Sequence, residues 1–117
     1  MMTDLIAFLR ARLAEDEATA RAAFSGQCDP ENGWGAERSV SGGWTITPHV
    51  GNIHEKVQAR HVEAWNPARV IAEVAAKRAI IGLCEPWGIP EDIMVLRLLA
   101  QPYADHPDFA PAWRLPE

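Results

Sequence analysis

Histidines and carboxylates are the side chains of this chain that could hold a metal ion. His54 and His61 are seven residues apart in a segment with helical spacing, and His106 lies between Asp105 and Asp108. Seven residues make two helical turns, which puts the two imidazoles on one face but roughly 10 Å apart, so one ion would need a third element between them. Neither an HExxH pattern nor paired CxxC motifs occur, although both are typical of zinc sites. We expect no cofactor. One alternative function is nevertheless a small metal-binding protein that uses His54, His61 and His106, with metal-dependent hydrolysis as one activity and zinc as the candidate metal.

The two cysteines, Cys28 and Cys84, are the candidate nucleophiles, with a histidine as the base. They do not form a CxxC pair, which favours reduced thiols in a cytoplasmic protein over a disulfide framework. Cys84 ends an apolar helical pattern, and the negative end of a helix dipole does not stabilise a thiolate. We therefore expect Cys84 to be a small buried apolar residue and the protein to be non-enzymatic, with no catalytic residue.

Tryptophan is frequent for a chain of this size, and it is a residue type enriched where proteins meet. Several of the five lie in predicted loops or at the ends of predicted helices and strands. The five are Trp34, Trp44, Trp65, Trp87 and Trp113. Each could instead fill a small core beneath a loop. We predict a binding surface formed by Trp44, Trp65 and Arg69, used for a protein partner or for self-association.

A nucleic-acid-associated regulator is the second alternative. It would combine four basic residues with Trp44 or Trp65 for base stacking; the basic residues are Arg60, Arg69, Lys77 and Arg78. Arg69 and Lys77 could line one helical face, but Glu73 lies between them. The chain also carries 11 Lys and Arg against 16 Asp and Glu, a net charge of -5 that argues against a general binder of nucleic acid or anionic membranes.

Length and composition indicate one domain, residues 1–117, with a modest core. The hydrophobic content of 48% and the charged content of 23% are ordinary for a globular protein. No apolar run approaches the roughly 20 residues of a membrane helix, and Asp4 and Arg10 interrupt the N-terminal segment where a signal peptide would be apolar. We expect a cytoplasmic protein.

Residues 66–84 give the clearest helical pattern. Asn66 is a favourable N-cap and Pro67 then occupies the first helical position. Val74 and Ile81 recur at helical spacing, with small alanines between the larger residues. The pattern predicts a core helix around which the rest of the chain packs.

The remaining segments alternate between helical and strand patterns. Residues 3–24 have an apolar helical stripe, residues 25–35 have loop composition, and residues 34–47 read as a β-hairpin that turns at Ser-Gly-Gly. Residues 48–52 read as a connector. A second helix is predicted from Ile53 to about Trp65.

One face of this second helix carries Ile53, Val57 and Ala64, with His61 beside them. Asn52 is its expected N-cap.

A fourth helix should begin at Pro90 and stop at Pro102. It is nearly all apolar, so it should be the most buried helix. Tyr103, Phe109 and Trp113 should hold the following tail against the core. The fold class is therefore a mostly helical α+β domain, with about four helices and one small β-hairpin between the first and second helices.

Three blocks of the chain, in this order, resemble a family of small uncharacterised proteins from high-GC actinobacteria and their phages, domain-of-unknown-function family 6221. The blocks are DLIAFLRARLAEDEATARAA, HVEAWNPARVIAEVAAKRAI and LRLLAQPYADHPDFAPAW, and together they cover more than half of the chain. The resemblance implies a phage-associated or prophage-associated accessory protein and supplies no activity. Members of the family often have a second His and an Asp where this chain has Trp65 and Asn66. Many also carry a cysteine-rich insertion, suggestive of zinc, in an interval that holds only Cys84 here.

Overall fold

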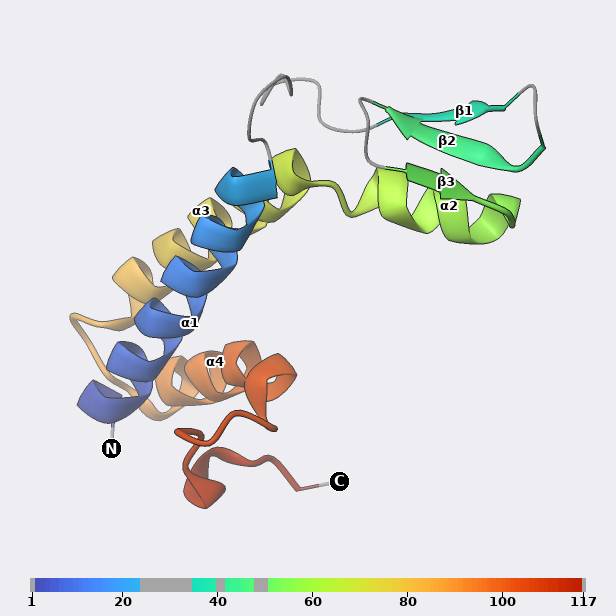
Figure 1. Ribbon diagram of the computed structural model, residues 1–117. Coiled ribbons are helices and arrows are strands. Elements are labelled where there is room, and N and C mark those ends of the chain that lie inside the picture. Colours follow the sequence, from blue (N-terminus) through green and yellow to red (C-terminus); the bar gives the residue numbers. More distant parts are fainter. Residues whose placement is uncertain (1, 24–34, 40–41, 48–50, 117) are drawn as a thin grey trace. The chain divides into compact units, whose positions relative to one another are not determined.

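The computed structural model describes residues 2–23, 35–39, 42–47 and 51–116 (Figure 1). The contacts of the chain divide it into two compact units, residues 17–73 and residues 1–16 with 74–117. We call them the middle unit and the terminal unit and treat each separately. The single domain expected from chain length stays a prediction. The predicted loop and Trp34 lie outside the described residues, apart from Gly35.

The middle unit contains a three-stranded antiparallel sheet in the order β1-β2-β3. Its strands are β1 (Gly35–Arg38), β2 (Trp44–Thr47) and β3 (Gly51–Ile53). The first two strands form the predicted hairpin. Gly43 at its turn has a φ of 72°, and an added Cβ there would lie 2.7 Å from Asn52 Oδ1. Glycine is required because β3 approaches so closely.

The third strand corrects the prediction of a connector over 48–52 and of a helix beginning at Ile53. Thr45 pairs with Asn52, and Trp44 pairs with Ile53, so both partners on β3 belong to the sheet. A strand of three residues that includes Gly51 carries too little alternation to be recognised from the sequence.

Helix α2 (Lys56–Ala64) begins later than predicted, with Glu55 at the N-cap position instead of Asn52. It lies along the sheet (Figure 1) and contacts all three strands, and Ala59 on α2 and Ile46 on β2 are both fully buried. Of the residues predicted to share one helical face, Ile53 belongs to β3, whereas Val57 and Ala64 lie on α2 and are exposed, Val57 to 82%. The buried residue of α2 is Ala59.

Helix α3 (Pro67–Cys84) begins as the sequence predicts. The backbone N–H of Arg69 donates to Asn66 Oδ1 at 3.1 Å, which is the N-cap bond expected of this asparagine. Its core role is narrower than predicted, because only one row of its residues is buried. That row is Pro67, Val74, Ile81 and Cys84, whereas Ala72, Ala75, Ala76 and Ala79 are exposed.

Helix α1 (Met2–Ala23) supplies the largest share of the terminal unit's core. Leu5, Leu9 and Leu13 recur every four residues and are at most 1% exposed. They share the core with the buried α3 residues of this unit and with Leu96 of α4. The predicted apolar stripe of the first helix is confirmed.

Helix α4 (Pro90–Ala100) has the predicted bounds but is not the most buried helix. Leu96 and Ala100 are buried, while Met94 and Leu98 on the opposite side are 44% and 53% exposed. The helix is apolar on more than one side, and the small unit has neighbours for only one of them.

The C-terminal tail packs as predicted, through short 3₁₀ turns η1 (Gln101–Tyr103) and η2 (Pro111–Trp113). Trp113 is 5% exposed, and its ring centroid lies 5.1 Å from that of Phe8 on α1. No helix in the described part of the chain combines the length and apolarity needed to cross a membrane.

Candidate functional site

The first part of the candidate site is a stacked pair, Trp65 and Arg69, at the junction between α2 and α3. The guanidinium carbon of Arg69 lies 3.9 Å from the centroid of the Trp65 ring, in a cation–π arrangement. Arg69 Nη1 also donates to the carbonyl of Ala64 at 3.3 Å, and Nε lies 3.8 Å from a carboxylate oxygen of Glu73. The Arg69 side chain is thus held in place over a ring that remains 49% exposed.

Capping bonds at the same junction fix the backbone that carries this pair. The N–H of Trp65 donates to the carbonyl of His61 at 3.0 Å, and Asn66 Nδ2 donates to the carbonyl of Glu63 at 2.8 Å. Asn66 therefore caps the start of α3 through Oδ1 and satisfies a carbonyl at the end of α2 through Nδ2. The four-residue spacing of Trp65 and Arg69 then brings the two side chains together.

Trp44, the third residue of the predicted surface, lies at the other end of α2. It is half-buried on β2, and Lys56 Nζ lies 5.6 Å from its ring centroid. The nine residues of α2 separate Lys56 from Trp65 by roughly 13 Å at 1.5 Å per residue. The predicted surface therefore consists of two cation–aromatic pairs that α2 connects, and Trp44 does not join Trp65 and Arg69 in one cluster.

Between the two pairs runs the outward side of α2. Val57, His61 and Trp65 follow one another every four residues, so they lie on the same side of the helix, and all three are exposed. Arg60 and Ala64 lie beside them and are also exposed. We call the set the α2 outer face: Val57, Arg60, His61, Ala64, Trp65 and the stacked Arg69.

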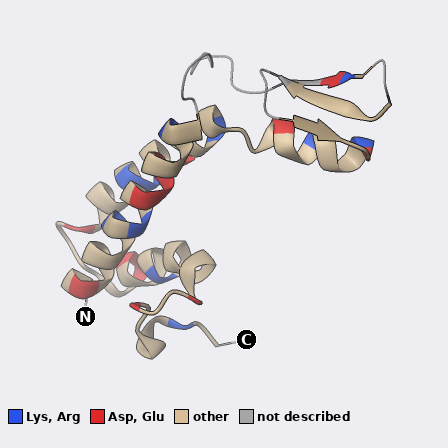
Figure 2. Cartoon of the chain, in the orientation of Figure 1, with Lys and Arg blue, Asp and Glu red and all other residues tan. Residues whose placement is uncertain are grey.

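This face is locally positive in a chain whose net charge is -5. It contains no Asp or Glu, because Glu63 is half-buried toward the sheet side of α2 and Glu55 precedes the helix. Figure 2 shows basic positions along α2 and acidic positions near its two ends. Within the described part of the chain, the Arg60 side chain forms no ion pair or hydrogen bond, so its guanidinium is available to a ligand.

The predicted metal ligands are not brought together. His54 and His61 are exposed, and the His61 ring packs at 6.4 Å from that of Trp65. His106 Nδ1 accepts the backbone N–H of Asp108 at 3.0 Å, while its ring lies edge-on to Phe8. Among the described residues, no three His, Cys, Asp or Glu side chains are grouped so as to hold an ion.

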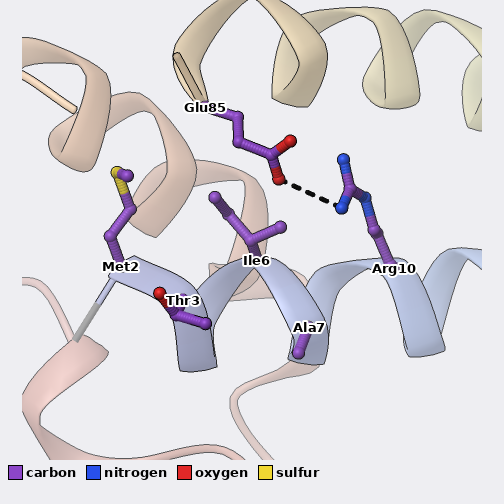
Figure 3. Close-up of a pocket in the computed structure, with 6 residues that line it drawn as sticks. All are labelled: Met2, Thr3, Ile6, Ala7, Arg10 and Glu85. Carbon is purple, nitrogen blue, oxygen red and sulfur yellow. Dashed lines mark ion pairs between the residues drawn. The ribbon is translucent and has the colours of Figure 1, made fainter. Parts of the chain in front are cut away.

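The terminal unit has a pocket of about 510 Å³ beside the first turns of α1 (Figure 3). An ion pair between Arg10 and Glu85, 3.0 Å apart, crosses its edge. The other lining residues are Met2, Thr3, Ile6 and Ala7. The only charged side chains among these six residues are those of Arg10 and Glu85, which pair with each other.

Cys84 is 5% exposed, which confirms the prediction that it is a small buried residue. Burial raises the pKa of its thiol above the usual value, and the nearby Asp92 carboxylate raises the pKa further. A thiol held in the neutral form is a poor nucleophile.

Exposed apolar side chains between residues 83 and 98 are a feature that the sequence analysis missed. They are Leu83, Trp87, Ile89, Met94, Val95 and Leu98, with Trp87 79% exposed. The available signal was the pattern of α4 itself, because a helix that is apolar all round must expose part of its apolar surface when a small unit cannot enclose it.

Comparison with known proteins identifies the family and no activity. Residues 2–115 match the model of DUF6221, a family of unknown function. No curated protein matches the chain, and no solved structure matches it. Membership of this family, which the three sequence blocks indicate, is confirmed.

Proposed function

The chain belongs to DUF6221, a family of unknown function, and we propose from its own surface that it is a non-enzymatic protein-interaction module. The α2 outer face is the binding surface of this proposal. A cytoplasmic location and an accessory role linked to phages, as the sequence resemblance implies, are part of the same proposal.

The observation that carries the proposal is the exposure of Val57 and Trp65 on one side of a helix whose opposite side is buried. Val57 is 82% exposed and Trp65 is 49% exposed. Apolar groups grouped in this way on a surface mark contact sites, whereas single scattered ones do not. Covering the exposed parts of both side chains would contribute about 3–5 kcal/mol, from roughly 25 cal/mol per Å² of apolar area.

Rigidity of the aromatic anchor also supports the proposal. Trp and Arg are the residue types that most often dominate binding energy at interfaces. Here Arg69 already stacks on Trp65, and the bonds of Asn66 fix the backbone between them. Binding of a partner would therefore cost little conformational entropy of the Trp65 side chain.

Photo-crosslinking tests the proposal. Benzoylphenylalanine is placed at Val57 or His61, and at Thr19 as an exposed control on α1, and the protein is expressed in its own source cells. We expect a discrete crosslinked protein, or a crosslinked second copy, from positions 57 and 61 but not from position 19. Equal crosslinking at all three positions would refute the proposal.

Trp65→Ala separates binding from folding in the same assay. Because half of the ring is in solvent, the variant should keep a melting temperature within a few degrees of wild type and lose most of the crosslink. A large drop in melting temperature with the crosslink intact would make Trp65 a structural residue.

A further inference from the structure

We infer that the occupant of the α2 outer face is an acidic amphipathic helix of a partner protein. This inference rests on the proposed function and names the chemistry of its ligand. Three properties of the face carry it: the spacing of its apolar residues, the sign of its charge and the way Trp65 is already covered.

The spacing of the anchors matches a helix. Val57, His61 and Trp65 stand about 6 Å apart, one helical turn each, in a row of roughly 12 Å on the solvent side of α2. A partner helix repeats its own apolar side chains every three to four residues, close to the same distance, so two turns of it can pack along the row.

The charge of the face selects acidic residues beside those anchors. Arg60 projects from the same side as Val57 and has no partner among the described residues, while the face itself contains no carboxylate. Glutamate or aspartate next to the apolar anchors of the partner would pair with Arg60 and lie near Arg69. A basic partner would be repelled by Arg60, and the Glu73 carboxylate, which lies 3.8 Å from Arg69 Nε, is already used by that ion pair.

A nucleic acid fits the same face less well. The guanidinium of Arg69 lies 3.9 Å from one face of the Trp65 ring, which closes that side to a stacked base. Val57, at 82% exposure, is one of the most accessible side chains of the face and offers a phosphate no contact. The favoured ligand is therefore one that has apolar groups and negative charges on the same side.

Selection from a random 16-residue peptide display library tests the inference without assuming a sequence. The full-length wild-type protein is the bait, and a Val57→Ser, Trp65→Ala double variant removes peptides that bind elsewhere. We expect the enriched peptides to carry net negative charge, with apolar residues at i, i+3 or i+4, and i+7. The best synthetic peptide should bind wild type with an affinity that falls as salt is raised.

Arg60→Glu measures the charge contribution, with Arg38→Glu as the matched control. Arg38 is also exposed and lies in the same unit on β1, and both substitutions change the net charge equally. The synthetic peptide should bind Arg60→Glu about 5- to 30-fold more weakly, whereas Arg38→Glu should change the affinity less than twofold. Arg60→Ala, with an intermediate loss, replaces Arg60→Glu if that variant does not fold.

The outcomes separate the inference from the proposed function. Enriched peptides that depend on Val57 and Trp65 but are neutral or basic, or that ignore Arg60→Glu, would overturn the acidic helix and leave an interaction module. A library with no peptide that depends on these two residues would overturn both. Tighter binding of a labelled 16-nucleotide single strand of RNA or DNA than of any peptide, lost in Arg60→Glu, would replace the helix with a nucleic acid.

Discussion

Val74→Asp tests whether the buried row of α3 holds the terminal unit together. Val74 is 2% exposed, so the substitution removes an apolar side chain from the core and puts a carboxylate in its place. Loss of the valine costs about 1.5–3 kcal/mol, and an unpaired buried charge costs several kcal/mol more. The sum, roughly 4–8 kcal/mol, is comparable to the whole free energy of unfolding of a small domain, roughly 5–15 kcal/mol.

Ala76→Asp provides the matched control. Ala76 lies two residues further along the same helix, on its exposed side, and receives the same charge. The expected cost there is the difference in helix propensity, at most about 0.7 kcal/mol. Any effect of net charge on solubility or expression is common to both variants.

Urea unfolding at pH 7, followed by far-ultraviolet circular dichroism, distinguishes the two substitutions. We expect Ala76→Asp to retain a cooperative transition near the wild-type midpoint, and Val74→Asp to be unfolded without urea or to have lost most of its midpoint concentration. Equal midpoints for the two variants would refute the burial of Val74 and the side of α3 assigned to the core.

Two further predictions concern buried titrating groups of the terminal unit. The Tyr103 hydroxyl donates to Asp16 Oδ2 at 2.5 Å, and burial, then this bond and the Asp16 charge, raise the pKa of Tyr103 well above 10. The hydrogen bond of the neutral Tyr103 hydroxyl therefore stabilises the folded state below pH 10, and this stabilisation is lost as pH rises toward the folded-state pKa. Tyr103 is the chain's one tyrosine, so tyrosinate absorbance at pH 11 should appear only when the protein unfolds. Tyr103→Phe should lower the free energy of unfolding by about 1 kcal/mol at pH 7 and by less at pH 11; an equal loss at both values would contradict the role of the hydroxyl. Cys84, in a Cys28→Ser background, should react with a disulfide reagent such as dithiobis-nitrobenzoate only as fast as the protein opens, and labelling at the rate of a free thiol in native buffer would contradict its burial.

Local signals in the sequence predict much of the fold. The Asn66 cap, Pro90 at the start of α4 and Pro102 after its end each act through the backbone within a few residues, so they place helix bounds correctly. The hairpin of β1 and β2 is likewise readable, because its turn glycines lie between the two strands. Strand β3 is not predicted from the sequence, because its formation depends on pairing with β2 more than on its own three residues.

The prediction fails where one side of a helix must be chosen. The apolar pattern of α2 shows that Val57 and Ala64 share a side, but it does not tell whether that side meets the sheet or the solvent. In the structure Ala59 occupies the contact with Ile46, because a short helix against a small sheet can bury only one narrow row. The same limit applies to α4, where Leu96 is enclosed and Leu98 is not.

In the candidate site, too, local spacing is predictable from the sequence and the exposed side of a helix is not. Trp65 and Arg69 are predictable as a pair, since four residues separate them across a cap and their stacking needs no distant partner. The roles of Val57 and Arg60 depend on which side of α2 meets Ile46, and the sequence of α2 alone does not contain that information. The exposure of Val57 and Trp65 on one side of α2 supports the proposed binding surface, because a partner that covers both side chains would remove apolar area from water.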